Sequence, residues 1–142
     1  MILEVTSPTR RLVKIPCESV SLPGSQGEFE VLPGHTPMLA TLKPGIVTFR
    51  RMQYSSDEKV LIWDNANVLR FMISGGAVEV QENRVEVLCD EASLPYEVDE
   101  ASERELLAEL KSRLESLSKS DEEESKVLAA KIAVSTAKLN LF

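Results

Sequence analysis

The residues best suited to chemistry are few and widely separated in this chain. It contains one histidine, His35, and two cysteines, Cys17 and Cys89, among 142 residues. The cysteines lack CxxC spacing, and a single histidine cannot complete a metal site with them. We therefore expect both cysteines to be reduced packing residues of a cytoplasmic protein, and we expect neither a metal nor another cofactor.

Carboxylates near the histidine offer a second kind of chemistry. Glu28 and Glu30 could form an acid–base pair, but positions i and i+2 of a strand at a turn are as readily solvated. No GxSxG elbow accompanies His35, so a serine nucleophile is not predicted. The run SGG at 74–76 lacks the lysine of a phosphate-binding loop, and a tight turn between strands is the better interpretation. The sequence therefore predicts no catalytic site.

Charge and hydropathy exclude two further classes of protein. Sixteen Lys and Arg against twenty-three Asp and Glu give a net charge of -7, the wrong sign for binding a nucleic-acid backbone. The first residues alternate like a strand and do not form a signal or transit peptide. No window approaches the roughly 18 consecutive apolar residues that a membrane-spanning helix needs. We expect any membrane association to come through a partner.

Two kinds of element must position the residues named above. Up to about residue 94 the apolar period is mostly two and turn signals recur, which predicts an antiparallel β-sandwich or flattened barrel. The clearest predicted hairpin joins 77–81 to 84–88 around Glu82 and Asn83, with one buried and one solvated face. Near Pro95 the period becomes helical. We therefore predict a β-sandwich domain over 1–94 and a helical domain over 95–142.

The second half reads as two amphipathic helices. A first helix is predicted after Asp99, a suitable N-cap, because leucines follow at helical spacing at positions 106, 107, 110, 114 and 117. Ser120 and Glu123 form an S-x-x-E capping box, which predicts the start of a second helix there. Burying both apolar stripes calls for an antiparallel two-helix hairpin.

Four segments together resemble the epsilon subunits of bacterial F-type ATP synthases, which belong to the delta/epsilon family. They read LPGSQGEF at 22–29 followed by VLPGHTPML at 31–39, LKPGIV at 42–47, ISGGAVEV at 73–80 and VEVLCDEA at 85–92. Their order, their spacing and the helical hairpin after them make the resemblance specific across nearly the whole chain. Glu30 departs from the pattern, because the family commonly has glycine there.

This resemblance implies a function, a location and a set of partners. The implied function is that of a non-catalytic central-stalk subunit that couples rotor rotation to ATP synthesis in the proton-translocating enzyme. Its implied partners are the gamma subunit and the c-ring, with alpha and beta subunits near the C-terminal helices. The implied location is peripheral, at the cytoplasmic face of the bacterial inner membrane. The alternative is an adaptor or chaperone-like assembly module built from the same two parts.

The resemblance also suggests which residues contact partner subunits. It implies that the long loop after position 22 faces the polar loops of the c-ring, which makes Glu28, Pro33, His35 and Met38 candidates for c-ring or gamma contacts. His35 could equally be a turn residue that packs or hydrogen-bonds locally. On the second helix, the resemblance suggests three lysines as contacts that restrain ATP hydrolysis: Lys126, Lys131 and Lys138.

Some members of the family also bind ATP, through an I/L-D-x-x-R-A motif and an arginine on the second helix. Here Val98 and Asp99 match the start of that motif, but Ser102 replaces its arginine and the second helix contains none. Each lost charge-assisted contact lowers affinity by roughly ten- to a hundredfold. We therefore expect ATP to bind poorly to this degenerate motif.

The stretch 51–69 is longer than the usual hairpin at this place in the family, and the sequence suggests no role for it. It contains Trp63, the only tryptophan of the chain. Packing in the core beside Val60 and Ile62 and exposure as a partner anchor are the two interpretations that the sequence leaves open.

Overall fold

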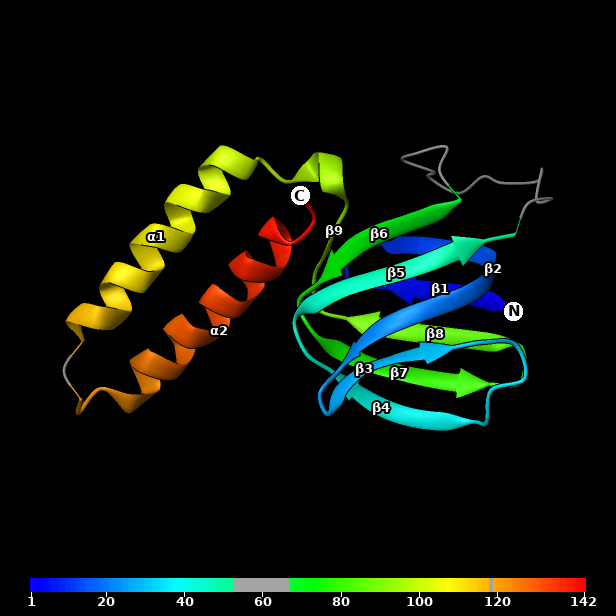
Figure 1. The fold of residues 1–142 in the computed structure, drawn as a ribbon. Coiled ribbons are helices and arrows are strands. Elements are labelled where there is room, and N and C mark those ends of the chain that lie inside the picture. Colours follow the sequence, from blue (N-terminus) through cyan, green and yellow to red (C-terminus); the bar gives the residue numbers. More distant parts are fainter. Residues whose placement is uncertain (53–66, 118) are drawn as a thin grey trace.

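The structure is a computed structural model that describes residues 1–52, 67–117 and 119–142. Most of the long stretch discussed above, including Trp63, lies outside the described residues. The described chain forms a β-domain followed by two antiparallel helices, which stand at one end of that domain (Figure 1). The predicted combination of a β-sandwich with a C-terminal helical hairpin is therefore confirmed.

The β-domain contains nine strands among the described residues. In chain order they are β1 (Ile2–Thr6), β2 (Arg11–Gly24), β3 (Gly27–Val31), β4 (Met38–Leu42), β5 (Gly45–Arg51), β6 (Val68–Ile73), β7 (Gly76–Gln81), β8 (Arg84–Cys89) and β9 (Ala92–Ser93). All pairings are antiparallel except that of β1 with β8. The long strand β2 pairs with β1 through its first half and with β5 and β3 through its second half, so it joins the two layers of the sandwich (Figure 1).

The core fills the space between these layers. Strand alternation places one face of each strand inside, and the rings of Phe49 and Phe71 meet edge to face with centroids 6.2 Å apart. Cys17 and Cys89 are buried, free cysteines, and burial raises the pKa of each thiol to about 11. Both cysteines are therefore packing residues, as predicted.

The predicted hairpin between β7 and β8 is confirmed in register. Val78 pairs with Val87 and Val80 with Val85, and all four side chains are buried. Asn83 turns the chain with a φ of 61°, a left-handed conformation that asparagine adopts more readily than most residues.

The helical part begins with a short 3₁₀ turn, η1 (Pro95–Glu97), and continues as α1 (Glu100–Ser116) and α2 (Glu122–Leu139). Asp99 caps α1 as predicted, because its Oδ1 accepts a hydrogen bond from the Ser102 N–H at 3.2 Å. Within the described residues, neither helix is long and apolar enough to cross a membrane.

The predicted start of α2 at Ser120 is wrong. The N-cap is Asp121, whose carbonyl accepts the first helical hydrogen bond, from the Ser125 N–H at 3.0 Å. Three glutamates at 122–124 follow in the first turn, where the helix dipole favours negative charge. This placement shifts the helix start past the serine.

Candidate interaction surfaces

The loop between β3 and β4 contains a type II turn that the sequence itself prescribes. Pro33 fixes the first central position, and Gly34 adopts a φ of 85° at the second. The turn closes with a hydrogen bond from the His35 N–H to the Leu32 carbonyl at 3.1 Å. The loop lies at the end of the β-domain that faces away from the helices (Figure 1). Its backbone is therefore held in one shape without help from another chain.

The His35 ring also makes a local contact. Its Nδ1–H donates to the Thr36 carbonyl, with 2.7 Å between the two atoms. The residue is half-buried, so part of the ring stays accessible at the surface of the loop. The local bond orients the ring and leaves Nε2 as the atom that can meet a partner.

The four interface candidates lie on two strands, β3 and β4, and on the loop that joins them. Glu28 is exposed near the start of β3, Pro33 and His35 lie in the loop, and Met38 begins β4 with its side chain half-buried against the core. The arrangement suits a broad contact with another protein better than a reaction at one point.

A groove that the sequence did not reveal lies between the tip of the β2–β3 hairpin and β4. The tip is joined to β4 by hydrogen bonds from the Ser25 N–H to the Thr41 carbonyl and from the Lys43 N–H to the Pro23 carbonyl, both 2.9 Å long. Beyond these bonds a cleft of about 580 Å³ opens. It is lined by Gly24, Ser25, Gln26, Gly27, Phe29, Met38, Leu39, Ala40, Thr41 and Ala77.

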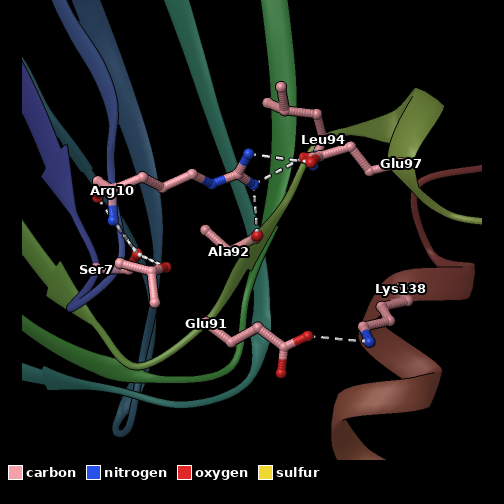
Figure 2. Close-up of polar contacts among 8 residues, drawn as sticks. Ser7, Arg10, Glu91, Ala92, Leu94, Glu97 and Lys138 are labelled. Carbon is pink, nitrogen blue, oxygen red and sulfur yellow. Dashed lines mark hydrogen bonds and ion pairs between the residues drawn. The ribbon is translucent and has the colours of Figure 1, made fainter.

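A group of hydrogen bonds joins the β-domain to the start of the helical part (Figure 2). The Arg10 guanidinium donates two hydrogen bonds to the Glu97 carboxylate, at 2.8 and 3.0 Å, and a third to the Ala92 carbonyl at 3.0 Å. Glu97 also accepts the Leu94 N–H at 2.9 Å. Hydrogen bonding to Arg10 lowers the pKa of Glu97, and the same bond raises the pKa of Arg10. We call this group the Arg10–Glu97 clamp.

The end of α2 rests on the sheet through a small apolar cluster and two polar contacts. Met72 of β6 is buried against Ala137 and Leu141. The Arg70 guanidinium donates to the Leu141 carbonyl at 2.7 Å. The Lys138 ammonium lies 3.1 Å from the Glu91 carboxylate, and Figure 2 shows this ion pair. Of the three candidate inhibitory lysines, Lys138 is therefore engaged with the β-domain, whereas Lys126 and Lys131 are exposed.

Residues of the degenerate nucleotide motif make contacts within the protein. Val98 packs against the Met72 cluster, and the Asp99 carboxylate caps α1. Arg104, the nearest arginine, pairs with Glu100 at 2.7 Å along the same helix. Val98 and Asp99 therefore both make contacts that support the fold of the helical part.

A cleft of about 500 Å³ lies between the two helices. It is lined by both basic and acidic side chains, among them Arg113, Lys131, Glu91 and Glu103. The Ser135 hydroxyl is buried beside it and has no hydrogen-bond partner within the described part of the chain. The lining of this cleft therefore carries charges of both signs.

Comparison with known proteins identifies the β-domain. The family model described as the beta-sandwich domain of the ATP synthase Delta/Epsilon chain matches residues 1–95. An ATP synthase epsilon chain of Desulfatibacillum aliphaticivorans is 38% identical over 116 residues, which are 82% of this chain and 74% of that one. Epsilon chain 2 of Syntrophotalea carbinolica is 32% identical over 128 residues, 90% of this chain and 83% of that one.

Solved structures share the fold across both parts. A chain in the Euglena gracilis mitochondrial ATP synthase superposes with a TM-score of 0.73 and 21% identity, covering 98% of this chain and 81% of that one. A chain of the Tetrahymena thermophila mitochondrial ATP synthase central stalk and c-ring gives a TM-score of 0.58 at 12% identity, covering 98% and 96%. With the family match over the sandwich and these curated relatives, the chain belongs to the delta/epsilon family of ATP synthase subunits.

Proposed function

We propose that this chain is the non-catalytic epsilon subunit of a proton-translocating F-type ATP synthase. It joins the gamma subunit and the c-ring into one rotor and so couples rotation to ATP synthesis. It is a peripheral member of a membrane-associated complex, at the cytoplasmic face of the bacterial inner membrane.

One observation carries the proposal: the similarity to curated epsilon chains extends through the β-sandwich into the helices. The match to the Syntrophotalea carbinolica chain covers 90% of this chain. An adaptor or chaperone-like module could contain the β-sandwich without the two helices that follow it in the same order. The adaptor alternative is therefore not favoured.

Within this proposal the two parts divide the work. Residues 1–94 form the assembly domain, and its contacts with gamma and the c-ring involve Glu28, Pro33, His35 and Met38. The fixed turn at Pro33 and Gly34 supports this assignment, because a preorganised loop loses little entropy on binding. The exposed carboxylate of Glu28 suits a basic or amide-bearing loop of a partner.

Residues 95–142 form the regulatory part. We propose that Lys126, Lys131 and Lys138 meet acidic residues of the alpha and beta subunits and restrain ATP hydrolysis. Lys126 and Lys131 are exposed in the docked arrangement, whereas Lys138 would first have to leave Glu91. Three lysines on a helix with an acidic first turn make this restraint weak.

Stoichiometric binding to the gamma subunit tests the proposed function. The purified chain should form a one-to-one complex with gamma, measured by light scattering after gel filtration. It should show no preference for unfolded clients such as reduced lactalbumin. Weak binding to many unfolded chains, with no defined complex with gamma, would favour the chaperone-like alternative instead.

A further inference from the structure

The groove beside β4 is bordered by a strand edge that, within the described chain, lacks a partner strand along most of its length. β4 pairs with β7 along its full length, from Met38 opposite Val80 to Leu42 opposite Gly76. On its other side, β4 pairs within the described chain only at Leu42, opposite Gly24 of β2. Within the described chain, residues 38–41 of β4 therefore have no strand pairing on that edge.

The direction of the backbone groups on this edge follows from one hydrogen bond. The Thr41 carbonyl accepts from Ser25, so it points away from β7. In an antiparallel ladder, alternate residues direct both backbone groups to the same side. Leu39, two residues earlier, therefore also directs its N–H and C=O away from β7, toward the unpaired edge. The Thr41 N–H points the same way.

The side chains beside this edge form an apolar groove that could bind an apolar side chain. Phe29 and Met38 are half-buried and line the groove, together with Ala40. The Leu39 side chain is 78% exposed on the opposite face of β4. An unpaired backbone edge beside an apolar groove is the arrangement that recognises extended peptides by strand addition. A free edge with an exposed leucine would otherwise favour aggregation.

The charge around the groove indicates what the added strand carries. Glu28 and Glu30 are exposed on β3, and Glu79 lies directly opposite Leu39 in the ladder with β7. Lys43 is the basic residue beside the hairpin tip. The matching segment therefore has an apolar side chain for the groove and basic residues flanking it.

We propose that β4 receives an extended segment of the gamma subunit, which adds a strand along the Leu39 edge and places an apolar side chain in the groove. This inference rests on the proposed function. The edge is continuous with the candidate interface, since Met38 belongs to both. We commit to gamma because the groove is apolar, whereas the loops of the c-ring are expected to be polar.

Amide hydrogen exchange of the full chain, alone and in its complex with gamma, tests the strand. The Leu39 and Thr41 amides should exchange at least tenfold more slowly in the complex. The Ala40 amide points toward β7, so it should be protected in both samples and serves as the internal control.

Two substitutions at the same position separate backbone from side chain. Leu39→Pro removes the edge N–H but no hydrogen bond to β7, so the fold should tolerate it at an edge. It should weaken binding to gamma by tenfold or more, whereas Leu39→Ala should weaken it less. Thermal unfolding of each variant checks that the fold is intact.

The outcomes distinguish this inference from the proposed function. If the wild-type chain forms no complex with gamma, the proposed function fails. If it forms the complex but the Leu39 and Thr41 amides exchange as in the free chain, strand addition is overturned. A concentration-dependent dimer of this chain that protects the same amides without gamma would also overturn it.

Discussion

The β-domain has one large buried core, whereas the helical hairpin buries few of its own apolar residues. Strand residues such as Leu3, Val5, Phe49 and Phe71 are almost fully inaccessible to solvent. On α1 only Leu110 is buried, and Leu106 remains 43% exposed. The difference indicates that the sandwich stabilises itself, while the hairpin depends on contacts at its base and on whatever covers its exposed stripe.

The same leucine-to-alanine change in both parts gives the largest expected contrast. Leu3→Ala should lower the free energy of unfolding by about 2 to 5 kcal/mol, because Leu3 is fully buried. Leu106→Ala should cost less than about 1 kcal/mol, since the side chain is half-exposed. Urea unfolding followed by circular dichroism measures both. Equal losses would contradict the contrast between the two parts.

Truncated chains test where the boundary between the β-domain and the helical part lies. A chain of residues 1–94 should fold, because the strand core closes before the helices begin. A chain of residues 1–98 should be more stable, by about 1 kcal/mol, because it keeps Glu97 and its bonds to Arg10 and Leu94. Calorimetry of the two fragments measures the difference. An unfolded 1–94 fragment would place the boundary elsewhere.

The contribution of the Arg10–Glu97 clamp to the free energy of unfolding should depend on pH. Its carboxylate and guanidinium are each about a third exposed, so solvent screening leaves roughly 0.5 to 1 kcal/mol. Since Arg10 lowers the pKa of Glu97 from its ordinary 4.5, the clamp stabilises fully above that value. The contribution is lost as the pH falls through the lowered pKa.

Glu97→Gln is the variant that checks this dependence. The difference in unfolding free energy between wild type and variant should be constant at neutral pH and shrink below about pH 4.5. If this difference in unfolding free energy instead grew on acidification, the predicted pH dependence of the clamp would be contradicted.

A smaller effect is expected where α2 rests on the sheet. Lys138→Ala removes the ion pair with Glu91 and should speed amide exchange near the end of α2 severalfold. Lys126→Ala, at an exposed position near the start of the same helix, is the matched control and should change nothing there. Equal effects of both substitutions would show that the Glu91 contact does not hold the helix.

The smallest expected effect is that of ATP. The structure engages Asp99 and Arg104 in contacts within α1, so we expect calorimetric titration to give a dissociation constant weaker than about a millimolar. Tighter binding that disappears in Asp99→Ala would show that the nucleotide motif works without its arginines.

Local patterns were enough to predict much of the fold. Alternating valines set the β7–β8 hairpin, because side chains on a strand point to opposite faces in turn. Asp99 capped α1 because a carboxylate at that position reaches the backbone N–H groups of the first turn. The cap of α2 was predicted one residue early, since Ser120 and Asp121 are both suitable and their local sequences do not separate them.

The sequence by itself thus determined the strands, the two helices and the family. Only the tertiary structure decided which surfaces form from residues far apart. Arg10 and Glu97 are 87 positions apart, and Lys138 meets Glu91 across two elements. The groove beside Leu39 likewise depends on β2 turning back at Gly24, which leaves most of one edge of β4 unpaired among the described residues. Periodicity reports the neighbours of a residue along its own element, whereas these contacts depend on how the elements pack.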